Sequence, residues 1–220
     1  MLGWLSGKLC PRRNISTFSK VFTSSSCNEL GEFLLTVESQ NDIEKMARKF
    51  STFTFLPPTT SSFPKKIGYL PLEQIDNRYN LCMFYLPENS SLPFHNHPQQ
   101  HVLLRVVFGE LDISSFDIVS NDSRIEPGRV YTVIDSSRNQ SVVSVNGPTQ
   151  IVRPNEKNIH KITARNGPAM FMDLVMPPYS WDRECVYFEE VPGEGKVRAV
   201  RERDVPLDME LVYPEQFFRS

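Results

Sequence analysis

The stretch PFHNHPQQHVLLRVVFGELDISSFD, residues 93–117, places three histidines, two of them in the tripeptide His95-Asn96-His97, before a long apolar run. The run from Val102 to Phe108 is rich in β-branched and aromatic residues, which is typical of a buried strand. Gly109-Glu110 predicts a tight turn, and residues 111–119 predict the returning strand. This order of elements places the histidines in an all-β domain and not on a helix.

The chain has only four histidines, at positions 95, 97, 101 and 160. His95 and His97 are two residues apart, so on a β-strand their side chains share one face, about 6–7 Å apart. His160 lies in the alternating segment 158–164, which predicts a strand with one buried face. Three imidazoles from two distant strands can bind one metal ion. The alternative is an exposed polar loop that happens to hold two histidines.

The composition limits the class of protein. With 220 residues and 40% hydrophobic content, the chain can bury one substantial core. Turn signals recur about every 8–12 residues between residues 80 and 190, a spacing that favours a β-sandwich or barrel. The net charge of −2 argues against a nucleic-acid binder. No apolar run is long enough to predict a membrane span.

The N-terminal segment 1–28 has four basic residues, many serines and no acidic residue. This composition is typical of a mitochondrial transit peptide, and the alternative is a flexible tail. The expected location is therefore mitochondrial or cytoplasmic. The four cysteines, Cys10, Cys27, Cys82 and Cys185, lack CxxC spacing, which predicts free thiols in a reducing compartment.

The remaining segments predict elements around the β-domain. Residues 28–50 predict two short helices that begin at an Asn28 cap and break at residues 39–41. Residues 51–67 predict an irregular linker, and residues 191–220 a covering extension with one or two edge strands. The expected division is residues 1–28, a helical segment with its linker at 29–64, the β-domain at 65–215, and a tail at 216–220.

A single carboxylate, Asp173, interrupts the apolar run at residues 169–175. A buried carboxylate is costly unless it is paired or hydrogen-bonded. One interpretation is that Asp173 lies at the rim of the sheet and accepts backbone hydrogen bonds. The other is a functional group that orients a ligand histidine or receives a substrate amine.

Three ordered stretches carry a resemblance to a known family: residues 93–117, NIHKITA at 158–164, and FMDLVMPPYSWDRECVYF at 171–188. Over residues 65–215 the chain resembles the cupin-fold thiol dioxygenases, specifically the 2-aminoethanethiol (cysteamine) dioxygenase and plant cysteine oxidase family. The resemblance implies a double-stranded β-helix, or jelly-roll barrel, with the short N-terminal helices packed outside.

The resemblance also implies a site. The matching histidines of the family bind one Fe(2+), which assigns that role to His95, His97 and His160. The family's DxxxPPY motif lines the substrate pocket, here with Asp173 and Tyr179. Cys185 and Tyr187 stand at a CxY motif that the animal enzymes associate with a thioether cross-link; the alternative is two neighbours on one strand face. His101 stands where many cupins carry a glutamate ligand, and it is interpreted as structural or as supporting the ligands.

The implied reaction is the oxidation of a 2-aminothiol by O2 to a sulfinic acid. Three neutral imidazoles leave the charge of the metal uncompensated, which favours a thiolate substrate. Cysteamine would give hypotaurine, whereas an N-terminal cysteine of a peptide would make the chain an oxygen sensor. The alternatives are a zinc cupin with hydrolase or isomerase activity, and a metal-binding cupin without turnover that acts through protein contacts. A monomer is the default.

Two departures from the family pattern fall at the mouth of the expected pocket. Gln99-Gln100 replaces a pair that contains glycine, and the segment between Tyr179 and Cys185 is shorter than in the animal enzymes. The sequence therefore leaves the choice between cysteamine and peptide open.

Overall fold

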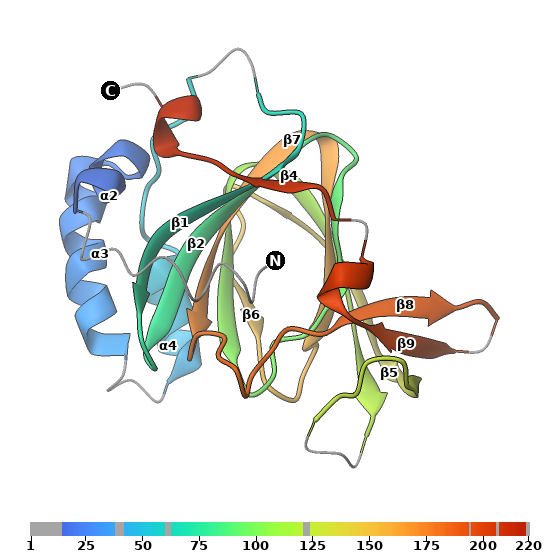
Figure 1. Ribbon diagram of the computed structural model, residues 1–220. Helices are drawn as coiled ribbons and strands as arrows, with labels where there is room; N and C mark the ends of the chain where they lie inside the picture. Colours follow the sequence, from blue (N-terminus) through green and yellow to red (C-terminus); the bar gives the residue numbers. More distant parts are fainter. Residues whose placement is uncertain are drawn as a thin grey trace.

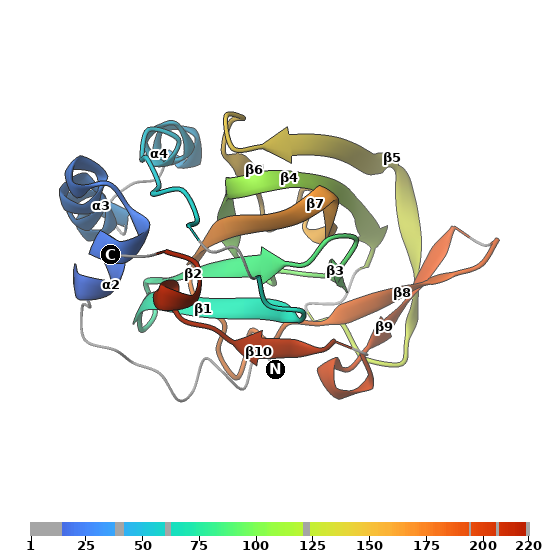
Figure 2. The same cartoon turned by 90° about the horizontal axis from the view of Figure 1, so that it is seen from above.

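The computed structural model describes residues 15–37, 42–59, 63–120, 124–193, 195–205 and 207–218. The described strands form one continuous sheet, in the order β10-β1-β2-β7-β3-β8-β9-β5-β4-β6, and an additional pairing of β7 with β4 closes it. Figure 2 shows the resulting barrel from above, with the helices grouped on one side. The predicted all-β cupin barrel with helices packed outside is confirmed.

The strands are β1 (Ile67–Ile75), β2 (Tyr79–Leu86), β3 (Ser91–His95), β4 (His101–Val119), β5 (Val130–Ser144), β6 (Gln150–Val152), β7 (Ile159–Met176), β8 (Tyr187–Val191), β9 (Lys196–Val200) and β10 (Met209–Leu211). The helices are α2 (Ile15–Val21), α3 (Ser24–Thr36) and α4 (Ile43–Phe50), with short 3-10 turns η2 (Glu202–Asp204) and η3 (Pro214–Gln216). Figure 1 shows α2, α3 and α4 together on one side of the barrel.

The predicted turn at Gly109-Glu110 is wrong, because β4 continues through these residues. Gly109 has a φ of 76°, and the pairing of β4 with β7 shifts its register on either side of Phe108. A Cβ on Gly109 would lie 2.5 Å from the carbonyl oxygen of Pro168 in β7. The glycine therefore makes a bulge that bends the strand around the barrel instead of reversing it.

Replacing Gly109 by alanine is expected to destabilise the protein by about 3 kcal/mol or more, because the methyl group meets backbone. Gly193 is the matched control, since its φ is 75° and a Cβ there meets nothing within 4 Å. Gly193→Ala should cost only about 1 kcal/mol, the penalty of the left-handed conformation. Urea unfolding measures the free energy of unfolding of both variants. Equal losses of stability in Gly109→Ala and Gly193→Ala would contradict a steric clash at position 109.

The N-terminal helices pack on the outer face of the barrel. Phe18, Val21 and Phe22 are buried, so residues 15–28 are folded onto the domain, while residues 1–14 lie outside the described part of the chain. The prediction of an Asn28 cap is wrong, because α3 already begins at Ser24 and Asn28 lies inside it. Two helices are present as expected, although the predicted break at residues 39–41 lies outside the described residues.

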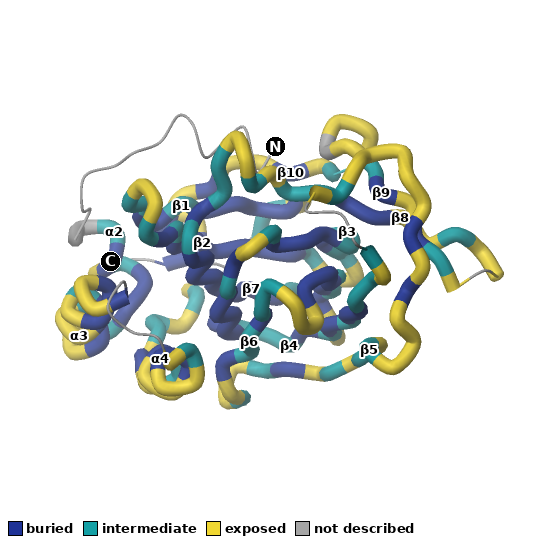
Figure 3. The backbone as a smooth tube through the Cα atoms, turned by 90° about the horizontal axis from the view of Figure 1, so that it is seen from below, coloured by how far each residue is buried: buried dark blue, intermediate teal, exposed yellow. Residues whose placement is uncertain are grey.

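Buried apolar residues form two main layers, one between the helices and the barrel and one inside the barrel. One joins the helices to the outer face of β1, β2, β4 and β7, and it includes Phe50 and Leu103. The other fills the barrel itself and includes Phe84, Phe171 and Cys82, which confirms that Cys82 is a core residue. Figure 3 shows buried backbone along these strands and exposed backbone on the outer helix faces and at the hairpin tips. Within the described residues, no helix is long and apolar enough to cross a membrane.

The extension after residue 191 contributes β9 and β10, in agreement with the expected strands. β10 pairs in parallel with β1 and lies at an edge of the sheet, whereas β9 lies between β8 and β5. The division of the chain at residues 28, 64 and 215 stays a prediction.

Candidate metal centre

Three buried histidines converge at one end of the barrel interior. His95 is the last residue of β3 and pairs in register with His160 of β7, whereas His97 lies in the loop before β4. The prediction that both early histidines lie on a strand is therefore right only for His95. The ring centroids form a nearly equilateral triangle, 5.1 Å for His95–His97, 4.7 Å for His95–His160 and 4.9 Å for His97–His160.

The spacing of the ring nitrogens suits one metal ion. One ligand nitrogen from each ring lies within 4.8 Å of the others, and the Nε2 atoms of His97 and His160 are 3.3 Å apart. Because an imidazole nitrogen lies about 2.0–2.1 Å from a bound metal, two ligand nitrogens are at most about 4.2 Å apart. The three histidines are therefore close to coordination geometry and could hold a metal.

Hydrogen bonds fix which nitrogen of each ring faces the centre. His95 Nδ1 lies 2.8 Å from the Pro93 carbonyl, which can only accept, so Nδ1 carries the proton. The Tyr179 hydroxyl donates to the Asn96 carbonyl at 3.0 Å and lies 2.7 Å from His97 Nδ1. Because the hydroxyl proton is already used, His97 Nδ1 donates to Tyr179. Both rings thus keep Nε2 free as a metal ligand.

Burial also keeps the rings neutral. It lowers the pKa of His95 to about 4, and it lowers the pKa of His97 and of His160 well below the usual value, helped by the neighbouring histidines. A metal ligand must be the neutral imidazole. The three histidines therefore need no deprotonation to bind a metal at neutral pH.

Asn158 positions His97, which no strand holds. Its side-chain oxygen accepts from the His97 backbone N–H at 2.9 Å, and its side-chain nitrogen donates to the His97 carbonyl at 2.9 Å. Asp117 in turn accepts from the backbone N–H groups of Lys157 and Asn158. Sequence reasoning gave Asn158 no role, although its two-residue spacing from His160 placed both on one face.

Asn96, between the two histidines, was also missed. Its backbone N–H donates to the Val186 carbonyl at 3.0 Å, and its side-chain oxygen accepts from the Val186 N–H at 2.8 Å. With the Tyr179 bond to its carbonyl, Asn96 connects the histidine loop to the segment from Tyr179 to Val186. No pattern in the sequence pointed to this role, since the contact joins residues 90 positions apart.

A small cavity of about 20 Å³ lies beside the histidines, lined by Tyr69, Gln74, Asn80, Cys82, Phe84, His95, His97, Asp173, Val175 and Tyr179. Asp173 is buried in β7, and its Oδ1 atom has no hydrogen-bond partner. The structure therefore places Asp173 inside the barrel and not at the sheet rim. Burial raises its pKa to about 8, so the carboxyl is mostly neutral at pH 7.

The structure brings Cys185 and Tyr187 to the same site. The Tyr187 ring lies 5.9 Å from the His95 ring, and the Cys185 thiol is close enough to Tyr179 and Tyr187 to influence both hydroxyls. Burial raises the pKa of Cys185 to about 12, which keeps the thiol protonated. His101 is half-buried and lies outside the group of three possible ligands.

A sequence profile of the PCO_ADO family matches residues 35–217. The chain belongs to this family. It is 32% identical over 139 residues to a probable 2-aminoethanethiol dioxygenase of Dictyostelium discoideum, a match that covers 60% of each chain. It is 28% identical to the Homo sapiens 2-aminoethanethiol dioxygenase, over 83% of this chain and 73% of that one. Plant cysteine oxidase 2 of Arabidopsis thaliana is 26% identical, over 84% of this chain and 68% of that one.

Solved structures with a similar arrangement include a cupin superfamily protein from Desulfitobacterium hafniense, with 14% identity, a TM-score of 0.37, and coverage of 53% of this chain and 83% of that chain. A double-stranded β-helix protein from Klebsiella pneumoniae has 13% identity and a TM-score of 0.41, covering 60% of this chain and 91% of its own. The match to the PCO_ADO family agrees with the resemblance carried by residues 93–117, 158–164 and 171–188.

The histidines of this PCO_ADO protein predict acid lability of the metal-free form. An unfolded histidine titrates near 6.5, and the folded values are lower, so stability present above pH 6.5 is lost as the pH falls toward 4. For His95 alone the loss corresponds to about 3 kcal/mol at pH 4. Asp173 acts in the opposite direction, because folding raises its pKa and its protonation at lower pH favours the folded state. One carboxyl gains stability as the pH falls while three histidines lose it, so we expect a net loss.

Urea unfolding with a chelator present, at pH 7 and pH 5, measures this loss. We expect a lower free energy of unfolding at pH 5 for the natural sequence and a smaller difference for His95→Asn. Equal or greater stability at pH 5 would show that the three rings are not held neutral by the fold.

Proposed function

We propose that the protein is an Fe(2+)- and O2-dependent thiol dioxygenase that converts a 2-aminothiol into a sulfinic acid. The observation that carries this proposal is the juxtaposition of three neutral, buried imidazoles with a small cavity lined by Asp173, whose Oδ1 atom has no hydrogen-bond partner. The names of the similar proteins, 2-aminoethanethiol dioxygenase and plant cysteine oxidase, support it.

The donor set suits ferrous iron and a thiolate. His95, His97 and His160 supply three nitrogen ligands and no negative charge, so a bound 2+ ion keeps its full charge and favours an anionic substrate sulfur. When bound, Fe(2+) would supply the redox chemistry that joins O2 to that sulfur. The conversion of a thiol and O2 into a sulfinic acid balances without a further reductant, because both oxygen atoms enter the product.

The residues of the chain orient the substrate and exclude water. Asp173 lines the same cavity as His95 and His97, and its Oδ1 atom has no hydrogen-bond partner. The cavity has room for only about one or two water molecules, so a substrate must displace the neighbouring side chains; its amine would then donate to Asp173 and its sulfur would lie toward the histidines. The charge of an ammonium group would favour the ionised carboxyl and lower its pKa. Phe84 and Val175 form apolar walls that keep bulk water out of the cavity.

Tyr179 and Cys185 complete the wall toward solvent. The Tyr179 hydroxyl holds the orientation of the His97 ring, and the protonated Cys185 thiol lies beside the Tyr179 and Tyr187 hydroxyls. A cross-link between Cys185 and Tyr187 would remove this thiol and rigidify the wall. The mass of the intact chain tests it, since a thioether between the two side chains removes two hydrogen atoms.

Mass spectrometry of a reaction with ¹⁸O2 tests the proposed function. Protein loaded anaerobically with Fe(2+) receives cysteamine and a peptide that begins with cysteine, and O2 is then admitted. We expect two labelled oxygen atoms on one or both thiols. Absence of oxidation, together with metal analysis that finds preferential zinc binding, would favour a zinc cupin or a binding protein instead.

A further inference from the structure

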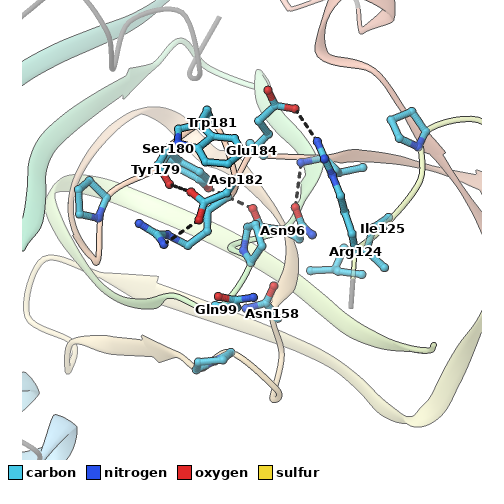
Figure 4. Close-up of a pocket in the computed structure, with 18 of the residues that line it drawn as sticks. Asn96, Gln99, Arg124, Ile125, Asn158, Tyr179, Ser180, Trp181, Asp182 and Glu184 are labelled. Atoms are coloured by element: carbon cyan, nitrogen blue, oxygen red, sulfur yellow. Dashed lines mark hydrogen bonds and ion pairs between the residues drawn. The ribbon is translucent and has the colours of Figure 1, made fainter. Parts of the chain in front are cut away.

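A groove of about 1670 Å³ lies on the solvent side of the metal centre. Figure 4 shows it, with Tyr179, Ser180 and Trp181 on one side and Arg124 and Ile125 on the other. Among the described residues, Gln74 and Tyr179 are shared between the lining of this groove and that of the small cavity beside the histidines. These two side chains therefore form the boundary between the groove and the proposed active site.

The size of the groove exceeds what a small aminothiol needs. Pockets for small molecules commonly measure about 300–1,000 Å³. Cysteamine, a two-carbon aminothiol, would leave nearly all of the 1670 Å³ groove unused. An extended polypeptide whose first residue passes Gln74 and Tyr179 toward the histidines would instead place its following residues along the groove.

Trp181 is the most exposed large apolar side chain on the described surface, at 86% of its maximal area, and it lines this groove. None of the ring contacts or hydrogen bonds found among the described residues involves its side chain. Tryptophan is one of the residue types enriched among those that dominate binding energies at interfaces.

The turn that carries Trp181 is held firmly. Ser180 and Arg183 exchange backbone hydrogen bonds, and the Ser180 hydroxyl bonds to Asp182. Glu184 reaches across the groove to Arg124 at 3.2 Å. Because these contacts already order the backbone of the turn, a ligand that stacks on Trp181 would cost the protein side-chain entropy at Trp181 but little backbone entropy.

The charges of the turn that carries Trp181 favour an apolar ligand side chain. Glu184 is paired with Arg124, and Asp182 with Arg183, while Arg201, Arg203 and Asp76 line other parts of the groove. The same lining includes apolar side chains from three other segments: Ile125, Val200 and Leu207. A charged ligand residue next to Trp181 would have to displace an existing ion pair, whereas an apolar one would not.

We propose that Trp181 is a specificity-determining residue that binds an apolar side chain among the residues following the N-terminal cysteine of a peptide substrate. This inference rests on the proposed function, because the cysteine itself must reach the histidines. It assigns the short segment between Tyr179 and Cys185 to recognition of the peptide beyond its first residue.

Anaerobic binding and turnover test the inference separately. Two peptides begin with cysteine and differ at one position near the N-terminus, leucine in one and glutamate in the other. Calorimetric titration of the Fe(2+)-loaded protein without O2 gives their affinities, and product formation after O2 is admitted gives kcat/KM. We expect the leucine peptide to bind more tightly and Trp181→Ala to weaken it at least about tenfold, with Trp181→Phe close to the natural protein.

The matched control is Leu35→Ala, another exposed apolar residue, which lies on α3 outside the groove lining. It should leave both peptide affinities unchanged.

In turnover, Trp181→Ala should lower kcat/KM for the leucine peptide at least about tenfold more than for cysteamine. Equal losses for peptide and cysteamine, unchanged peptide affinity in Trp181→Ala, or no peptide binding by the natural protein would each overturn the inference. Peptide binding that depends on Trp181 without oxidation of any thiol would support the inference and refute the proposed dioxygenase.

Discussion

Replacing His160 by alanine is expected to abolish metal binding and, with it, thiol oxidation. The two remaining rings, His95 and His97, could supply only two nitrogen ligands. Loss of residues that merely support metal ligands typically lowers affinity about 10–100-fold, so removal of a ligand should cost more than about 100-fold. Anaerobic titration with Fe(2+) followed by metal analysis measures the affinity, and product mass measures the activity.

His101→Ala is the matched control for this experiment. His101 is half-buried and lies outside the group of three possible ligands, so its loss should leave the metal content unchanged. Circular dichroism of both variants would show that the barrel persists, since His160 pairs through its backbone with β3 and β4. A His160→Ala protein that retains full iron and activity would contradict the assigned ligand set.

Replacing Tyr179 by phenylalanine should weaken metal binding about 10–100-fold while the fold is preserved. The Tyr179 hydroxyl accepts from His97 Nδ1 at 2.7 Å and thereby keeps Nε2 as the free ligand atom. Without it, the Nδ1 proton of a fully buried ring has no acceptor, and the other tautomer, with a protonated Nε2, becomes favourable. That tautomer cannot bind the metal through Nε2.

Tyr187→Phe provides the comparison for metal affinity. The Tyr187 ring is buried and lies 5.9 Å from the His95 ring, but its hydroxyl makes no hydrogen bond to a histidine. Its removal should therefore leave Fe(2+) affinity within about twofold, a change below about 0.5 kcal/mol. If both variants lose affinity equally, general packing around the rings and not the tautomer of His97 would account for the effect.

The ligand histidines could be found in the sequence because two of them are close together in the chain and the third lies in an alternating segment. The two-residue spacing drew attention to His95 and His97, although only His95 lies on a strand and His97 lies in the loop before β4. His160 lies on β7, as the alternation of residues 158–164 predicts. The apolar, β-branched character of residues 102–108 likewise predicts a buried strand. These inferences depend on residues that are near one another in the chain.

The contacts between distant segments could not be predicted in this way. The turn predicted at Gly109 is a bulge, because the pairing of β4 with β7 continues past it and decides the path of the strand. His97 reaches the centre from a loop that Asn158 holds across 61 positions of sequence. Neither the bulge at Gly109 nor the position of His97 can be recognised from the residues next to it in the sequence.

What the sequence by itself determined is the all-β class, the three candidate metal ligands and the family, since apolar periodicity and short motifs express local geometry. Only the tertiary structure decided that Asp173 lines a small cavity beside the histidines and that Trp181 stands exposed at the neighbouring groove. The physical reason is that burial and exposure depend on which distant strands and loops close around a side chain, and no single segment of the chain carries that information.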